Sequence, residues 1–316
     1  MSTQSAGVAL AAAAAPGSRI RRRRGKGLPY LLLVPSVAVL IAAMGYPLVW
    51  QVISSLQEFG LAQQFGQPAP FVGFGNYATL AADPYLWAVV FRSLAFCAVA
   101  AATTMAVGVA LALLMRVVHR PVRIALQVSL LLAWAMPVVA AMTVWRWLVD
   151  WRRGVLNSVL TGIGLDFRNH NWLQDPLSFF GVAAVIVIWM SVPFVAFSVY
   201  AGLSQVSDEV LEAAQMDGAS PVQRFFGIVV PIIRPVLGIV LLLQIIWDLR
   251  VFTQIKLLQE AGSIASETNL LGTYIYQLGA GASDFGTASA VSIFVLALTV
   301  ALSAFYVRSL LKEDAA

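Results

Sequence analysis

The sequence predicts an all-α membrane protein with six transmembrane helices, on the basis of its composition and the length of its apolar stretches. Of the 316 residues, 60% are hydrophobic and 11% are charged, whereas about a quarter of the residues of a soluble domain are charged. Inside a bilayer every backbone N–H and C=O needs a partner within the protein, which leaves helices or closed barrels. The apolar stretches are about twenty residues long and do not alternate, so they fit helices rather than barrel strands.

Hydropathy places these six spans in one membrane domain over residues 28–310. The spans are expected at Tyr30–Val52, Ala88–Met115, Ile124–Trp147, Phe179–Leu203, Val236–Leu258 and Phe285–Val307. The first stretch is longer than the core of a signal peptide, so we expect it to stay in the membrane as an anchor. Residues 1–27 are expected to form a disordered, basic N-terminus, and residues 311–316 a short tail.

Basic residues predict which loops face the cytoplasm. The runs at 21–26 and 116–123 are basic, whereas residues 54–87 contain no Lys or Arg. Because cytoplasmic loops carry an excess of Lys and Arg, both termini are expected in the cytoplasm. The loop at 150–178 is an exception, since Arg152, Arg153 and Arg168 fall on the outer side. The positive charge lies at span ends, so we expect contact with membrane lipids and no binding of nucleic acid.

The sequence offers no pattern typical of a catalytic or metal site. Cys97 is the only cysteine and lies in an apolar stretch, so no internal disulfide can form. His119 and His170 fall in loops, and no metal-binding spacing of Cys and His exists. A phosphate-binding G-x-x-x-x-G-K-[ST] loop is also missing, because the Gly-Lys-Gly run at 25–27 lacks the hydroxyl residue and the glycine-rich lead-in. We therefore expect that the chain is not an enzyme.

The segment at 204–235 lies between spans four and five and is predicted to form two short helices joined by an elbow. Ser207 is a candidate N-cap of the first helix, whose apolar face is expected to contain Leu203, Val206, Val210, Ala213 and Ala214. Gly218 can adopt the left-handed conformation that ends a helix, and Ser220 with Pro221 can open the second. Pro231 and Pro235 are expected to interrupt the helical hydrogen bonds as the chain returns to the membrane.

Two readings of the first helix of this elbow remain open on physical grounds. It could lie on the bilayer as an interfacial helix, or it could dock on a partner protein. A helix that rests on an anionic leaflet favours Lys and Arg, whereas this one carries Asp208, Glu209, Glu212 and Asp217. The charge therefore favours a protein partner.

The same segment resembles a known motif. Glu212-Ala213-Ala214, then Gly218, and later Ile228 and Val230-Pro231 at matching intervals resemble the EAA loop of binding-protein-dependent ABC importer permeases. The longer run 212–220 is similar to the carbohydrate branch, which includes the maltose and glycerol-phosphate permeases. Further similarity lies at 71–77, 172–173 and 201–203, while residues 259–263 differ from the Thr-Gly-Gly-Gly-Pro turn that carbohydrate permeases often carry.

This resemblance implies a type I importer permease of the bacterial cytoplasmic membrane, the first of two different permease subunits. The elbow would be a coupling helix seated in a separate ATPase subunit, which would bind ATP and Mg²⁺; this chain itself would bind no cofactor. The coupling residues would be Glu212, Ala213, Ala214, Asp217, Gly218 and Ala219. A periplasmic or lipid-anchored binding protein would deliver the solute.

Polar groups inside spans predict where a solute passes, because they are costly in lipid. Gln244 and Asp248 are four residues apart and share a helix face beside Trp247. An amide, a carboxylate and a flat ring suit the hydroxyls and the C–H face of a sugar. The resemblance points to the same positions, and in span four to Met190, Ser191 and Phe194. Alternatively, Asp248 pairs with a neighbouring helix and Trp247 only packs.

An ion-coupled secondary carrier for a small polar solute is the alternative function, since Asp248 could titrate during transport. Such carriers typically have inverted repeats and more than six spans. Dependence of uptake on ATP separates the two functions.

Overall fold

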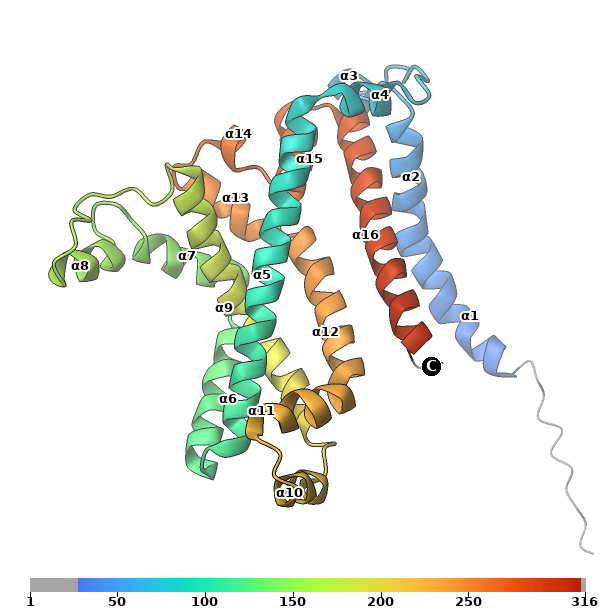
Figure 1. Ribbon diagram of the computed structural model, residues 1–316. Coiled ribbons are helices and arrows are strands. Elements are labelled where there is room, and N and C mark those ends of the chain that lie inside the picture. The colour runs from blue at the N-terminus through green and yellow to red at the C-terminus, as the bar shows by residue number, and fades with distance from the viewer. Residues whose placement is uncertain (1–27, 314–316) are drawn as a thin grey trace, which may run out of the picture. The chain divides into compact units, whose positions relative to one another are not determined.

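The computed structural model describes residues 28–313, and nearly all of its regular structure is helical (Figure 1). Within those residues, the only β pairing is an isolated antiparallel bridge between Gln57 and Phe71. The chain divides into two units, Met1–Val49 and Trp50–Ala316. The basic run at 21–26, the expected disorder of residues 1–27 and the end of the tail at 314–316 lie outside the described residues.

The described part of the first unit is a helical stretch. It contains α1 (Leu28–Leu40), the π-helical turn η1 (Ile41–Gly45) and the beginning of α2 (Tyr46–Ser55), which continues into the second unit. Between residues 33 and 49 its apolar side chains are exposed on every side. A helix that is hydrophobic all round suits a lipid environment, and Leu33–Ser55 is long and apolar enough to cross a membrane. The first predicted span is therefore confirmed as a helix.

The second unit contains the remaining helices. They are α3 (Leu61–Gln64), α4 (Gly75–Ala82), α5 (Pro84–Val117), α6 (Arg120–Ala135), α7 (Val138–Leu148), α8 (Val155–Gly162), α9 (Pro176–Leu203), α10 (Asp208–Met216), α11 (Pro221–Arg224), the π turn η2 (Phe225–Val229), α12 (Val230–Leu249), α13 (Thr253–Glu260), α14 (Ala265–Thr268), α15 (Leu271–Tyr276), the π turn η3 (Gln277–Gly281) and α16 (Phe285–Glu313). The helices α5, α9 and α16 confirm the second, fourth and sixth predicted spans.

The two long helices α5 and α9 begin in the same way and pack against each other. Asp83 and Asp175 cap them through side-chain oxygens, and a proline follows each cap, which is the favoured arrangement of a helix start. Near the elbow, Gly108 lets the two backbones approach closely, because a Cβ there would lie 2.5 Å from Cγ1 of Val195. This contact packs α5 closely against α9, the helix that leads into the elbow.

The third predicted span, Ile124–Trp147, is formed by two helices rather than one. The chain forms α6 and α7 with a bend of 100° between them. The break lies at Met136 and Pro137, where Met136 has a ψ of 126°. A residue before proline avoids the helical region, and proline lacks the N–H that the helix needs. The described residues therefore hold five helices that could span a membrane, or six if this bent pair counts as one span.

The fifth predicted span, Val236–Leu258, lies within the stretch Pro221–Glu260 that is long and apolar enough to cross a membrane, but a break inside it was not predicted. A helix runs without interruption from Pro221 through η2 and α12, and α13 is a separate helix after a break at 250–252. Pro231 and Pro235 do not end the helix; instead, the chain widens before them into η2, where the N–H of Val230 reaches the carbonyl of Phe225. A π turn accommodates a proline because it relieves the clash with the preceding turn.

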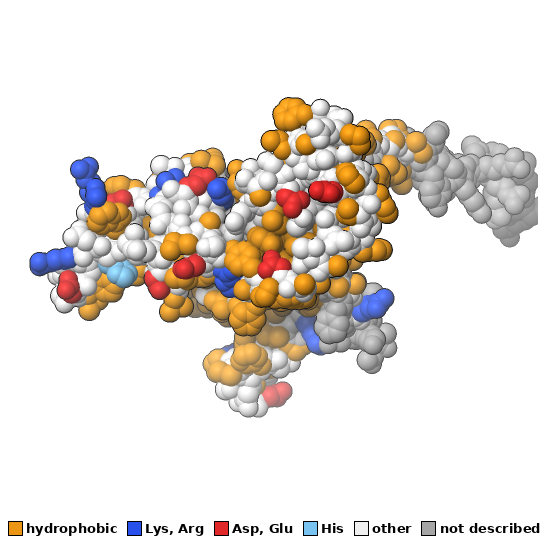
Figure 2. Space-filling view, turned by 90° about the horizontal axis from the view of Figure 1, so that it is seen from above, with side chains coloured by type: hydrophobic (Ala, Val, Ile, Leu, Met, Phe, Trp, Pro, Cys, Tyr) orange, Lys and Arg blue, Asp and Glu red, His pale blue; other side chains and the backbone are white. Residues whose placement is uncertain are grey.

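The second unit has two ends, which we call the elbow end and the far end. Figure 1 shows α10 and α11 at the elbow end and α3, α4 and α14 at the far end. Figure 2 views the far end and shows charged side chains scattered there among hydrophobic ones. The turn at 259–263 lies at this end, and buried Gln259 donates to Thr268 and Asn269, which ties the turn to α14 and the residue after it.

Candidate functional site

The elbow contains one short helix, α10, and a tight turn into the long helix that starts at Pro221. Gly218 has a φ of +83°, which confirms the predicted left-handed end of the first helix. The N–H of Ala219 donates to the carbonyl of Ala214 at 3.0 Å, as expected for a helix that ends in this way. The sequence was wrong about a second short helix, because α11 is the first turn of a continuous helix.

The second helix start is capped as predicted, and the first is not. Ser220 accepts a hydrogen bond from the N–H of Gln223, and the Gln223 side chain accepts one from the N–H of Ser220. This reciprocal pair is a capping box. Ser207 stands at the cap position of α10, but its side chain makes no cap hydrogen bond. Arg224 donates to Oε1 of Gln215 at 2.8 Å and so ties the two helices together.

The predicted apolar face of α10 is divided between the core and the surface. Leu203 and Val206 are buried, and Leu211 packs against the same core cluster. In contrast, Val210 is 47% exposed and Met216 is 87% exposed. Leu203 and Val206 of the predicted apolar face are thus buried and Val210 is exposed, because the core reaches α10 from the side of Leu211. The opposite side of α10 presents apolar groups to the surroundings.

Every expected coupling residue lies on this surface or at its edge. Glu212, Ala213, Asp217 and Gly218 are exposed, while Ala214 and Ala219 are half-buried. Within the described residues, the carboxylates of Glu212 and Asp217 form no hydrogen bond or ion pair. The elbow surface thus combines the unpaired carboxylates of Glu212 and Asp217 with exposed apolar side chains. Next to them, the small residues Ala213, Gly218 and Ala219 leave the backbone accessible.

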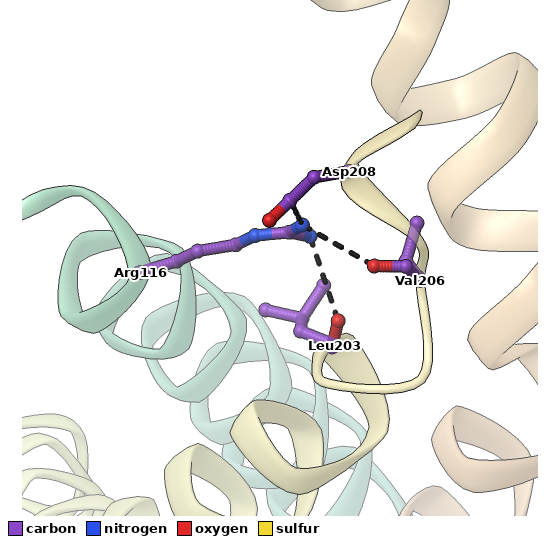
Figure 3. A network of polar contacts seen from close by, with 4 residues as sticks. All are labelled: Arg116, Leu203, Val206 and Asp208. Atoms are coloured by element: carbon purple, nitrogen blue, oxygen red, sulfur yellow. Dashed lines mark hydrogen bonds and ion pairs between the residues drawn. The ribbon is translucent and has the colours of Figure 1, made fainter. Parts of the chain in front are cut away.

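Arg116 at the end of α5 holds the linker that leads into α10 (Figure 3). Its guanidinium reaches Oδ1 of Asp208 at 2.5 Å, the carbonyl of Val206 at 3.4 Å and that of Leu203 at 3.5 Å. A cation suits the negative end of α9, whose last residue is Leu203. Sequence reasoning treated Arg116 only as part of a basic loop. Acidic residues at the start of α10 were the signal that could have identified this partner.

The expected pathway residues converge on one region between α9, α12 and α13. Gln244 is fully buried and Asp248 is 3% exposed, and the amide Nε2 of Gln244 donates to Oδ1 of Asp248 at 2.9 Å. Oε1 of Gln244 and Oδ2 of Asp248 are buried without a hydrogen-bond partner among the described residues. Since buried polar atoms are almost always paired, these two oxygens mark a place that a ligand group could complete.

Asp248 of this pair borders a cavity of about 320 Å³. Ser191, Trp247 and Asp248 line it together with Val187, Ile246, Arg250, Val251, Phe252, Thr253 and Gln254. Its volume lies at the lower end of the range for small-molecule sites, about 300–1,000 Å³. Three of the expected residues contact the lining rather than the cavity: Gln244 bonds to Asp248, Phe194 meets the Trp247 ring edge-on at 4.9 Å, and Met190 accepts a hydrogen bond from Gln254.

Four lining residues were missed because the helix break at 250–252 was not predicted. In a continuous span Arg250, Phe252, Thr253 and Gln254 would point to different sides, whereas the break turns them towards the cavity. Val251 in the break is buried in a core cluster together with residues of α9, and the break contains neither proline nor glycine. Closely spaced polar residues at 248–254 were the available signal.

Comparison with known proteins agrees with this architecture. A family described as "Binding-protein-dependent transport system inner membrane component" matches residues 102–310. The diacetylchitobiose uptake system permease protein DasB of Streptomyces coelicolor is 36% identical over 298 residues, which cover 94% of this chain and 90% of that protein. The sulfoquinovosyl glycerol transport system permease protein SmoG of Agrobacterium fabrum is 30% identical over 290 residues, with 91% of each covered.

A solved structure shares the fold. It is a bacterial alginate ABC transporter in complex with an alginate pentasaccharide-bound periplasmic protein, and the matched chain has a TM-score of 0.76 at 24% identity, covering 88% of this chain and 92% of its own length. The predicted resemblance to importer permeases is confirmed by the family match and the two curated relatives. The chain therefore belongs to the family of inner membrane components of binding-protein-dependent transport systems, and it is a multi-pass permease subunit of an ABC transporter.

Proposed function

We propose that this permease is one of two different permease subunits of an importer that takes a sugar across the cytoplasmic membrane and is driven by a separate ATPase. The observation that carries the proposal is the surface of α10, where the carboxylates of Glu212 and Asp217 and the exposed Val210 and Met216 lie together. A protein with a basic cleft lined by apolar groups would complement this surface. Charge complementarity would orient it, and burial of the apolar groups would hold it.

The ATPase supplies the energy and binds ATP and Mg²⁺ in this proposal. The six coupling residues are its contact, with Glu212 opposite a basic residue. Motion of α10 reaches the membrane helices by two routes: the Gln215–Arg224 hydrogen bond leads into α12, and the Asp208–Arg116 pair leads into α5. Helix α12 carries Gln244 and Asp248, so the elbow and the cavity share one rigid element.

The substrate is a sugar or a related polyhydroxylated solute, and Ser191, Gln244, Trp247 and Asp248 are its contacts, supported by Met190 and Phe194. The two orphan oxygens at Gln244 and Asp248 suit hydroxyl donors, and Trp247 suits the C–H face of a sugar ring. The names of the relatives, which refer to diacetylchitobiose and to sulfoquinovosyl glycerol, support the same class.

The proposed orientation puts the elbow end, both termini and the tail at 311–316 in the cytoplasm and the far end outside, with one permease domain at 28–310. The basic connection between α5 and α6 lies at the elbow end, where Arg116 and Arg123 contact Asp208 and Tyr200, which agrees with the positive-inside rule. A periplasmic or lipid-anchored binding protein delivers the solute at the far end, and the second permease completes the pathway.

Two measurements test the proposal. A tagged chain, solubilised gently from its own cells, is expected to copurify with an ATPase, a second permease and a binding protein that mass spectrometry identifies. The purified complex in proteoliposomes is then expected to accumulate sugar only with ATP and binding protein present. Isolation of the chain alone in a stable form, or uptake that persists without ATP, would contradict the proposal.

A further inference from the structure

Helix α9 carries a row of side chains that reaches beyond the cavity. Val187 and Ser191 line the cavity, and Phe194 lies two helical turns after Val187, so it shares their face of α9. The Phe194 ring meets Trp247, which also lines the cavity, edge-on at 4.9 Å. Phe194 therefore stands directly beside the site already described.

A third aromatic ring continues this row on α6. Trp134 lies in the last turn of α6, and the centre of its ring is 6.2 Å from that of Phe194. Among the described residues no ring contact joins Trp134 to Trp247, so Phe194 separates the two tryptophans. Helix α9 packs against both α6 and α12. We call Trp247, Phe194 and Trp134, which come from three helices, the aromatic row.

The rings of the aromatic row remain accessible. Trp134 is 51% exposed, Trp247 is 45% exposed and Phe194 is half-buried. The planes of neighbouring rings are inclined to each other by 37° and 61°. Neither pair is therefore stacked face to face, and flat ring surface is left for another partner.

The depth of Trp134 does not suit an anchor at the membrane surface, where tryptophan is enriched. Helix α6 begins at Arg120 in the basic connection at the elbow end. Trp134 lies about 21 Å further along the helix, which is inside a bilayer core of roughly 30 Å. Its contact with Phe194 in the middle part of α9 agrees with this depth.

The backbone next to Trp134 indicates a pathway rather than lipid. The helix breaks at Met136 and Pro137 with a bend of 100°, and Met136 is 39% exposed. Non-helical backbone at membrane depth occurs where it is buried in protein or lines a water-filled cavity. A second break, at 250–252, lines the cavity itself. Transporters place such broken helices at solute sites near the middle of the membrane.

We propose that Trp134 supplies a second ring subsite, and that the solute is an oligosaccharide of at least two linked rings. One ring binds in the cavity against Trp247 and Asp248, and the next ring lays its C–H face on Phe194 and Trp134. A single ring cannot cover both tryptophans, because Phe194 separates them. This inference rests on the proposed function and adds the length of the substrate to it.

Fluorine NMR tests contact with the aromatic row. The complex is purified with 5-fluorotryptophan and without the binding protein, and resonances are assigned by their loss in Trp134→Phe, Trp247→Phe and Trp87→Phe. The probes are two series of increasing length: N-acetylglucosamine, diacetylchitobiose and triacetylchitotriose, and glucose, maltose and maltotriose. Monomers are expected to shift the Trp247 resonance alone, whereas longer sugars of at least one series shift Trp247 and Trp134 together. Trp87, which is 51% exposed and meets Phe294 at 6.4 Å, is the control that stays unchanged.

The outcomes separate this inference from the proposed function. A Trp134 resonance that stays unchanged while Trp247 responds to sugars would overturn the second subsite and leave the sugar pathway intact. Equal responses of the two tryptophans to a monomer would show that one ring contacts both, and would overturn the requirement for two rings. No response of either tryptophan to any of these sugars would contradict the sugar pathway and this inference together.

Uptake into proteoliposomes tests whether the second subsite contributes to transport. Trp134→Ala is expected to raise the concentration of a two- or three-ring sugar needed for half-maximal uptake about fivefold, which corresponds to about 1 kcal/mol of lost ring contact. Trp134→Phe, which keeps an aromatic ring, is expected to restore most of this loss, and Trp87→Ala is expected to cause none. No change in Trp134→Ala, or an equal change in Trp87→Ala, would contradict the subsite.

Discussion

The elbow and the cavity both present polar groups that have no partner among residues 28–313, but they do so in opposite environments. At the elbow, Glu212 and Asp217 are exposed, and water hydrates them at little cost. At the cavity, Oε1 of Gln244 and Oδ2 of Asp248 are buried, and each unpaired group costs about 1–3 kcal/mol. The exposed carboxylates therefore cost little stability in the absence of a protein partner. The unpaired oxygens of the buried pair do cost stability, and the packing of the surrounding helices has to offset that cost.

The two regions also differ in how they are held. Around the cavity, helix packing and ring contacts such as Phe194 against Trp247 fix the side chains. The linker into α10 is held mainly by one cation, Arg116, and its carbonyl and carboxylate partners. The elbow surface, which we propose moves with a partner, is thus held by a few polar contacts. The cavity, which has to keep its shape, is held by side-chain packing.

The largest effect is expected from charge reversal at the elbow. Glu212→Lys places a positive charge opposite the basic residue that we propose on the ATPase, and like charges at an interface cost several kcal/mol. Uptake in proteoliposomes should fall at least about tenfold, at about 1.4 kcal/mol per tenfold, while the permease still reaches the membrane. Glu209→Lys on the same helix is the matched control with a smaller expected loss. Normal ATP-driven uptake by Glu212→Lys would refute the docking role.

Removal of the buried carboxylate tests the cavity. Asp248→Ala leaves the Gln244 amide unpaired and removes a proposed acceptor of sugar hydroxyls. We expect uptake to fall about tenfold, the change that corresponds to about 1.4 kcal/mol, with normal amounts of assembled complex. Asp248→Asn preserves shape and an acceptor oxygen, so its loss should be smaller. If both variants transported sugar at the original rate, the pathway would lie elsewhere.

A smaller effect is expected from the ring platform. Trp247 is 45% exposed, and an edge-on aromatic pair is worth about 0.5–1.5 kcal/mol. Trp247→Ala should therefore raise the sugar concentration needed for half-maximal uptake by roughly three- to tenfold, in proportion to that energy. Trp87→Ala is a matched control, since Trp87 is 51% exposed and meets Phe294 edge-on. Equal changes in the two variants would indicate a general loss of packing.

The smallest effect is expected at the salt bridge of the linker. The Asp208 side chain is 82% exposed, so Asp208→Asn should cost only about 0–1 kcal/mol. Arg116→Ala should cost more, about 1.5–3 kcal/mol, because two backbone carbonyls also lose a charged donor. The thermal unfolding midpoint of the purified complex, measured for each variant, shows which of the two substitutions lowers stability more. A larger drop for Asp208→Asn would show that the carboxylate, and not the carbonyl contacts, holds the linker.

Local patterns predicted those parts of the molecule in which neighbouring residues decide the structure. The long apolar helices, the left-handed Gly218 and the Ser220 capping box follow from hydropathy, backbone sterics and side-chain capping, and each was confirmed. The break between α6 and α7 was missed although Pro137 signalled it, because the apolar run continues through the bend. The surroundings of the cavity were predicted only in part, since the break at 250–252 has no local signal as strong as a proline.

The sequence by itself determined that this is an α-helical membrane protein with an acidic elbow typical of importer permeases, because charge density, span length and motif spacing are properties of the chain read in order. Only the tertiary structure decided that Arg116 meets Asp208 and that Gln254 joins Ser191 and Asp248 around one cavity. The physical reason is that these contacts join residues far apart in the chain. Their distances depend on how whole helices pack, which no local pattern specifies.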